Sequence, residues 1–233
     1  MLIVGGDGGV DVRIAGGRIL DVGPGLDRRG EDDVVDAGGG AIVPGLHDHH
    51  VHLRATAAAA ASVPVGQLQE AAVNTPPGQW LRAVGYHESI AGPLDRWRLD
   101  ELVPDRPVRV QHRSGGLWVL NSLALDLAGA ATADEPGIER DEHGTPTGRL
   151  WRLDGWLAGV VPPTPLDLAA VSRQAASQGI VGFTDADPHR TQADVDLLAT
   201  AEMAQHVTLM SSAGLDLPDA FTPGPRKLLL DDD

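Results

Sequence analysis

The pattern of apolar and polar residues divides the chain into regions of different character. Residues 1 to 45 hold short alternating runs, and in "DVRIAGGRILDVG" the pair Gly16-Gly17 separates two β-prone stretches. Two glycines between such runs are typical of a two-residue β-hairpin. Residues 54 to 165 are mixed, with an alanine-rich start that favours a helix and proline-rich turns after it. We therefore predict a small β-structure over 1–45 and a separate mixed subdomain over 54–165, joined by a short apolar strand that ends in residues 46–53.

From residue 166 to residue 233 the pattern alternates between helix and strand. Asp167 can cap a helix that Gly179 ends, and the run "TQAD" at 191–194 has the spacing of a capping box before a second helix. The run "IVGFTDAD" is typical of a short apolar strand that ends in carboxylates. Strands and helices that alternate with short links imply parallel pairing, so this region is predicted to be α/β.

Composition excludes several classes of protein. The chain has 233 residues, of which 42% are hydrophobic, so a packed globule is expected. Its net charge of −15 repels phosphate backbones, which argues against nucleic-acid binding. No apolar run reaches the length of a membrane span and no secretory signal is visible, so the expected location is cytoplasmic with no membrane partner. Since cysteine is absent, any metal must be held by histidine, carboxylate or a rarer ligand.

Four histidines and one aspartate lie within residues 47 to 52, in the stretch "PGLHDHHVHL". Alternate residues of a strand point to the same side, so the imidazoles of His50 and His52 can converge on one cation. The alternative is a pair of hydrogen-bonded histidines in a polar loop. Asp48 lies one pleat further back on the same side, where it either holds a ligand histidine or caps the strand.

This stretch also resembles a known signature. The segment "DAGGGAIVPGLHDHHVHL" resembles the first-strand motif of the amidohydrolase superfamily, Pro-Gly-x-x-Asp-x-His-x-His. The segment from Trp80 to Leu125 resembles the insertion domain of the amidohydrolase-3, or YtcJ-like, branch, and "GIERDEHGTPTGRL" and "GIVGFTDAD" fit the same branch. The resemblance implies a TIM-type (β/α) barrel that is preceded by a β-sandwich segment. It also implies that His50 and His52 are metal ligands on the first barrel strand.

The only lysine of the chain is a third candidate ligand. The chain has 17 arginines and a single lysine, Lys227. A lysine amine can be deprotonated and modified in ways that a guanidinium cannot. In the superfamily a fourth-strand lysine is often carboxylated and bridges two metals. The resemblance places Lys227 at that position, in a strand expected near 226–231. The alternative is a solvated charge at a strand edge that blocks aggregation.

The substrate contacts are less defined. Candidate pocket residues in the insertion are Tyr86, His87 and His112. The alternative is that these three side chains pack within the insertion. The chain also departs from the branch pattern at three positions, since Gly116 and Thr184 stand where histidine is common and Arg152 where glutamate is usual. Substrate contacts of the branch therefore do not carry over to this chain.

The resemblance implies a reaction and an incomplete site. Two histidines and a carboxylated lysine suit zinc or a similar divalent ion, and the implied reaction is hydrolysis of a non-peptide carbon–nitrogen bond in a small amide-like substrate. The expected strands number about four, half of a barrel that takes about 250 residues, and the family's general base has no counterpart. We therefore expect a partial barrel, the N-terminal portion of a longer enzyme, that alone binds metal weakly and hydrolyses amides poorly or not at all.

Such a portion is expected either to self-associate as a homo-oligomer or to need the missing C-terminal half as a partner, because an open barrel edge exposes unpaired backbone groups. The alternative function is that of a non-catalytic half-barrel that acts as a binding or assembly module.

Overall fold

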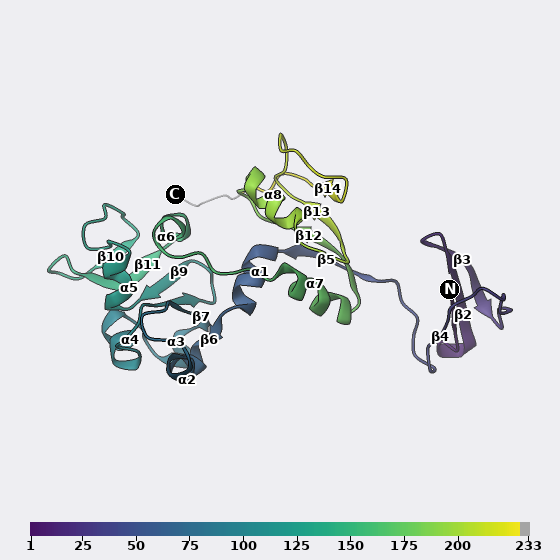
Figure 1. Ribbon diagram of the computed structural model, residues 1–233, viewed down its shortest axis with the longest axis horizontal. Coiled ribbons are helices and arrows are strands. Elements are labelled where there is room, and N and C mark those ends of the chain that lie inside the picture. The colour runs from purple at the N-terminus through teal and green to yellow at the C-terminus, as the bar shows by residue number, and fades with distance from the viewer. Residues whose placement is uncertain (229–233) are drawn as a thin grey trace. The chain divides into compact units, whose positions relative to one another are not determined.

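The computed structural model describes residues 1–228 and divides into two compact units, Met1–Leu46 and the chain from His47 onward (Figure 1). The elements of the first unit are β1 (Leu2–Val4), the 3-10 turn η1 (Asp7–Gly9), β2 (Val10–Ala15), β3 (Arg18–Pro24) and β4 (Val34–Asp36). They form a four-stranded sheet in the order β3-β2-β1-β4. The predicted hairpin is present, because β2 and β3 pair antiparallel around Gly16 and Gly17, whose φ angles are +56° and +71°.

Two buried charged side chains fasten this small sheet to its loops. The carboxylate of Asp11 accepts hydrogen bonds from the backbone N–H groups of Gly5, at 3.0 Å, and Leu26, at 2.9 Å. Arg13 forms an ion pair with Asp32. Buried polar groups stabilise a structure only when they are paired, so these contacts hold the loops that a short sheet cannot cover with apolar residues.

Residues 63–161 of the second unit form a region that we call the lobe. Its elements are β6 (Val63–Pro64), η2 (Val65–Gln67), α2 (Leu68–Asn74), β7 (Leu81–Tyr86), α3 (Glu88–Ala91), α4 (Arg96–Leu102), β8 (Val108–His112), β9 (Leu117–Leu120), α5 (Ser122–Leu127), β10 (Ile138–Arg140), β11 (Pro146–Trp151) and α6 (Asp154–Val160). The strands form a mixed six-stranded sheet in the order β10-β11-β9-β8-β7-β6, in which β6, β7 and β8 are parallel neighbours. Two hydrophobic clusters pack this sheet against its helices.

The rest of the second unit is a sheet of four strands with helices packed on it. Its elements are β5 (Leu46–Val51), α1 (Leu53–Ala60), α7 (Leu168–Ser177), β12 (Ile180–Asp185), α8 (Gln192–Ala199), β13 (His206–Leu209) and β14 (Phe221–Pro223). The strand order is β5-β12-β13-β14, and β12, β13 and β14 are parallel. Leu53 and Ala57 of α1 share one buried cluster with Val171 of α7 and Phe183 of β12. The chain is therefore an α/β protein, as predicted, and the described strands do not close a barrel.

Local signals in this region are confirmed at both helix starts. The side chain of Asp167 accepts a hydrogen bond from the N–H of Ala170, and Thr191 and Asp194 form the predicted capping box at the start of α8. Each cap supplies an acceptor to a helix N-terminus, whose first N–H groups have no partner within the helix.

The strand predicted over 226–231 is absent from the part of that range that the structure describes. Residues 226–228 are not in a strand, residues 229–231 lie outside the described residues, and β14 is the edge strand among those described. Pro223 and Pro225 supply the physical reason, because proline has no N–H to donate to a neighbouring strand. The pairing with β13 therefore ends before Lys227 is reached.

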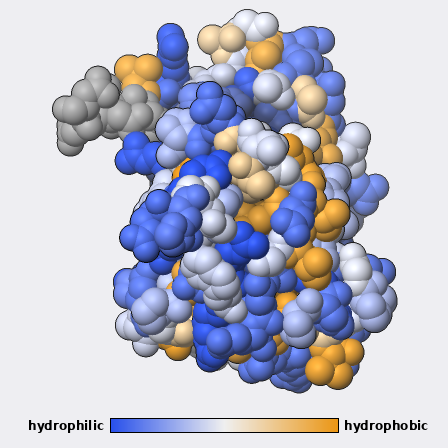
Figure 2. All heavy atoms as spheres, turned by 90° about the vertical axis from the view of Figure 1, so that its left-hand side faces the viewer, coloured by the Kyte–Doolittle hydropathy of each residue, from blue (hydrophilic) through white to orange (hydrophobic). Residues whose placement is uncertain are grey.

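The surface of the second unit is mostly hydrophilic on the face drawn in Figure 2, with a band of hydrophobic residues right of the centre of the view. Exposed large apolar residues of the lobe include Ile90, Trp97, Leu127 and Trp151. Among the described helices, none is both long enough and apolar enough to span a lipid bilayer.

Candidate functional site

Strand β5 and the residue after it carry the four clustered histidines. The ring centroids of His50 and His52 lie 5.5 Å apart with an edge-to-face orientation. His47 and His49 form the other close pair, with ring centroids 4.4 Å apart. Residues two positions apart in a strand share a face, so the local backbone sorts the four rings into two pairs.

Lys227 reaches the first of these pairs from the far end of the sequence. Its Nζ lies 3.3 Å from Nε2 of His50, although 177 positions separate the two residues. Its backbone N–H donates to Oγ of Ser211 at 3.0 Å, which fixes the chain after β14. An ammonium group only donates hydrogen bonds, so Nε2 of His50 accepts this contact and directs a lone pair toward Lys227. The fold thus gathers three nitrogen-bearing side chains at one end of the sheet.

A cavity of about 870 Å³ opens beside His52 and Lys227. Its other walls come from the loop after β12 and from the lobe, and they include Asp187, His189, Ser114, Gly115, Gly116, Arg152 and Asp154. Two positions at which the chain departs from the YtcJ-like pattern, Gly116 and Arg152, are therefore in the wall of this cavity. The departures alter the space next to His52 rather than the sheet that carries it.

Burial changes the ionisation of two groups near this cavity. Burial, and then the ammonium of Lys227, lower the pKa of His52, which favours the neutral ring that can ligate a metal. Asp185 at the end of β12 is 2% exposed, and its burial raises its pKa. The guanidinium of Arg190 lies 3.4 Å from the Asp185 carboxylate and opposes that rise.

Asp48 and His47 have supporting contacts. The Asp48 carboxylate accepts a hydrogen bond from the backbone N–H of His50 at 3.0 Å, which agrees with a capping role for Asp48 in its strand. Nε2 of His47 lies 2.9 Å from Oγ1 of Thr184 on the neighbouring strand. A Cβ atom at Gly182 would lie 2.3 Å from Nδ1 of His47, so the glycine makes room for this ring.

The candidate pocket residues of the insertion lie elsewhere. Tyr86, His87 and His112 gather at the ends of β7 and β8 in the lobe, outside the lining of the cavity beside His52. The ring of His112 stacks on His87 and meets Tyr86 edge-on, with centroids 5.4 Å apart in both cases.

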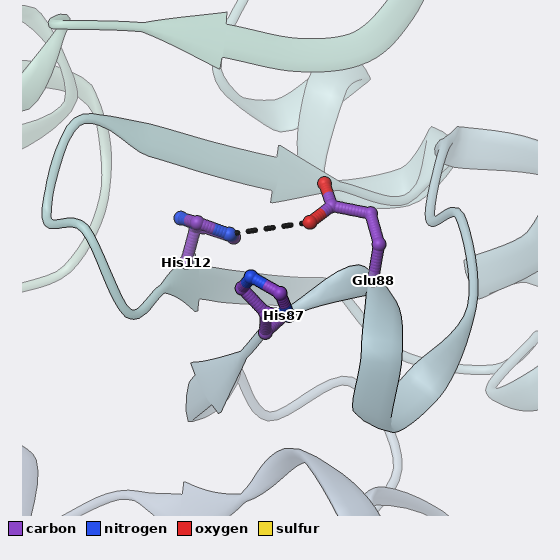
Figure 3. A group of neighbouring side chains, drawn as sticks. All are labelled: His87, Glu88 and His112. Atoms are coloured by element: carbon purple, nitrogen blue, oxygen red, sulfur yellow. Dashed lines mark ion pairs between the residues drawn. The ribbon is translucent and has the colours of Figure 1, made fainter.

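Glu88, which the sequence did not single out, completes a group with the two histidines (Figure 3). The run Tyr-His-Glu before a helical turn is the only local sign of it, because its partner His112 comes from another strand.

Comparison with known proteins shows which family this chain resembles. The sequence profile of the amidohydrolase family matches residues 33–231. An N-substituted formamide deformylase from Arthrobacter pascens is 38% identical over 162 residues, which cover 60% of this chain and 30% of that protein. A putative amidohydrolase, YtcJ, from Bacillus subtilis is 27% identical over 175 residues, 65% of this chain and 33% of that protein. The structure of an uncharacterized metal-dependent hydrolase from Pyrococcus furiosus aligns with a TM-score of 0.57 at 18% identity, covering 90% of this chain and 50% of that one.

The sequence profile and the Bacillus relative both carry the name amidohydrolase. The matched segments cover 30% and 33% of the two relatives, so this chain spans only part of their length. At 18% identity the Pyrococcus structure shows that the fold is shared. The profile match extends through β5, the lobe and the strands after it. The chain therefore belongs to the amidohydrolase family, in the YtcJ-like branch that its first-strand motif and insertion indicated.

Proposed function

We propose that the chain carries the metal-binding part of a hydrolase that cleaves non-peptide carbon–nitrogen bonds in small amides. The observation that carries this proposal is the contact between Lys227 Nζ and His50 Nε2, 3.3 Å long, next to His52. The relative named N-substituted formamide deformylase directs the proposal to N-substituted formamides as the first substrate class to test.

The four-stranded sheet would supply the first half of a TIM-type barrel. Its strand order β5-β12-β13-β14 follows the order of the chain, as successive strands of such a barrel do. Chemistry in these barrels takes place at the carboxyl ends of the strands. His52 follows β5, Asp185 ends β12 and Lys227 follows β14, so all three occupy that end.

The donors present fit a zinc-class cation. His50 and His52 offer imidazole nitrogens, and Lys227 would become the third ligand as a carbamate. Carbamate formation joins the neutral lysine amine to carbon dioxide and releases one proton. It replaces an ammonium that would repel a cation by an anionic oxygen donor beside His50. When bound, the metal would lower the pKa of a water molecule to about 7 and polarise the substrate carbonyl.

Residues in the wall of the cavity would transfer protons and select the substrate. The cavity volume of about 870 Å³ is enough for a small amide, and its wall combines the carboxylate of Asp187 with the ring of His189. These two groups, together with Asp154 in the same wall, would exchange protons with a substrate held beside His52. Gly116 and Arg152 in the same wall would set which N-substituents fit.

The decisive test is metal retention. We expect purified chain, loaded with zinc in bicarbonate buffer and then dialysed, to retain one equivalent of zinc more than the His52→Ala and Lys227→Ala variants, as measured by elemental analysis. Lys227→Arg is the matched control for charge, because arginine keeps the cation but forms no carbamate, and it should lose the metal as Lys227→Ala does. Slow release of formate from an N-substituted formamide should disappear in the same variants.

Zinc content that is unchanged in both the His52 and the Lys227 variants would refute the assignment of these ligands. Formate release that persists without them would refute their part in hydrolysis. His143→Ala, which removes an exposed histidine of the lobe, should leave the metal beside His52 unchanged.

A further inference from the structure

The lobe holds a second group of metal-type donors, at the ends of two parallel strands. His87 follows β7, Glu88 opens α3 and His112 ends β8, and Figure 3 shows the three side chains turned toward one another. One donor atom from each residue lies within 4.8 Å of the other two. We propose that His87, Glu88 and His112 bind a zinc-class divalent cation, at a site separate from the one at the end of β5.

The spacing of two of these donors is also that of two ligands on one metal ion. Nε2 of His112 lies 3.4 Å from Oε2 of Glu88. A charge-assisted N–H···O bond is shorter, about 2.7–2.9 Å. Two ligand atoms, each about 2.0–2.1 Å from a tetrahedral zinc ion, are separated by about 3.3 Å. The pair therefore already has the separation of two neighbouring corners of a zinc tetrahedron.

Both imidazoles are oriented by the same local motif, His-x-Ser. Nδ1 of His87 lies 2.7 Å from Oγ of Ser89, and Nδ1 of His112 lies 2.8 Å from Oγ of Ser114. Each Nδ1 also accepts a backbone N–H bond from its serine, at 3.2 Å and 3.1 Å, so a neutral ring carries its proton on Nε2. Ligation through Nε2 would require that proton on Nδ1, where the serine hydroxyl would accept it in place of the bond from the serine backbone N–H. Ligand histidines in metal sites commonly make such a bond through their other nitrogen.

The carboxylate is held by its other oxygen. The hydroxyl of Tyr86 donates to Oε1 of Glu88 at 3.3 Å, and it accepts the backbone N–H of Leu94 at 3.0 Å. The guanidinium of Arg149 lies 4.0 Å from the same Oε1. Both contacts engage Oε1, so Oε2 is left directed at His112. The neighbouring cation thus sits on the far side of the carboxylate from the proposed metal.

Two imidazoles and one carboxylate are the donors of a borderline divalent ion such as zinc, and not those of calcium or magnesium, which prefer oxygen alone. Three protein ligands leave one tetrahedral position for water. The site would tie the end of β7, the start of α3 and the end of β8 together, so occupancy should raise the thermal stability of the lobe.

The test uses the full chain with His50→Ala and His52→Ala already introduced, so that zinc bound at the end of β5 does not contribute. In that background we expect one equivalent of zinc to survive dialysis, and cobalt(II) to give the intense visible absorption of a four- or five-coordinate site. Adding His112→Ala or Glu88→Gln should remove the equivalent, the absorption and the rise in melting temperature that zinc produces. Circular dichroism shows whether each variant is folded, and Glu88→Gln preserves the size and shape of the side chain.

The chain offers a matched control in the same lobe. Glu142 and His143 also form a histidine–carboxylate pair, with Nε2 and Oε1 3.5 Å apart, but their side chains are 87% and 79% exposed. His143→Ala should change neither zinc content nor cobalt absorption. A background protein that retains no zinc, or one whose zinc survives both His112→Ala and Glu88→Gln, would overturn the proposal and leave the group as a hydrogen-bonded network. Failure here leaves the ligands at the end of β5 untouched.

Discussion

At the scale of single residues, the sequence predicted features that depend on neighbouring residues better than contacts between distant strands. The Gly16-Gly17 hairpin and the caps at Asp167 and Thr191 depend on neighbours within a few positions, and all three are present. The grouping of Glu88 with His112 joins two strands, so the local run Tyr-His-Glu was not enough to predict it. Nor did periodicity join Lys227 to His50; only the family resemblance suggested it.

The buried side chain of Asn121 joins several backbone segments of the lobe by hydrogen bonds. The Oδ1 atom of Asn121 accepts hydrogen bonds from the N–H groups of Val108 and Ala124, both at 3.0 Å, and its amide donates to the carbonyls of Val103 and Arg106. Asn121→Ala removes a helix cap and leaves buried backbone groups without partners. We expect a loss of at least about 2 kcal/mol in the free energy of unfolding, measured by urea denaturation.

Asn74 gives the comparison for that measurement. Its amide donates to the carbonyl of Glu70 at 3.2 Å, in an exposed position. Asn74→Ala should therefore change stability by less than about 0.5 kcal/mol. Equal effects of the Asn74 and Asn121 substitutions would contradict this account of the lobe.

At the scale of elements, the sequence placed helices better than strand ends. The apolar run after Lys227 suggested a strand over 226–231, but the prolines that precede it end the pairing at β14. Strand pairing is a property of two segments, so an apolar run alone does not say where a strand stops.

Strand β11 shows how tightly the elements of the lobe approach one another. Gly148 has a φ of +94°, and a Cβ atom there would lie 2.5 Å from the carbonyl oxygen of Leu120 and 2.7 Å from the backbone nitrogen of Arg96. Gly148→Ala should destabilise the lobe by about 3 kcal/mol, because it adds a backbone clash to left-handed strain.

Gly144→Ala separates the effect of the left-handed backbone from the effect of the backbone clash. Gly144 has a φ of +79° but has open space around it, so its substitution should cost only the strain of about 1–2 kcal/mol. Thermal unfolding of both variants measures the difference, and a similar shift in both would show that the close approach at β11 does not matter.

At the scale of the whole molecule, the described sheets have open edges. The first unit leaves Ile19, Leu20 and Val22 of its edge strand β3 between 54% and 63% exposed. Unpaired edges with apolar side chains favour association between chains. We expect the 233-residue chain to self-associate at micromolar concentration in sedimentation equilibrium, and a Val22→Lys variant to shift the distribution toward the monomer.

A monomer at all concentrations would contradict this expectation. Arg18→Lys, which keeps a charge at the start of the same strand, is the control and should leave the distribution unchanged.

The position of the lobe in the sequence, between β5 and β12, has a consequence for folding. His50 and Lys227 are neighbours in space only after the chain has closed a loop of more than a hundred residues. Loop closure costs about 0.6 kcal/mol for each doubling of loop length, and long-range contacts slow the search for the native state. The lobe has its own buried clusters and its own sheet, so its early collapse would shorten the effective loop before β12 meets β5. We therefore expect the contact between His50 and Lys227 to form late in folding, after the lobe has collapsed.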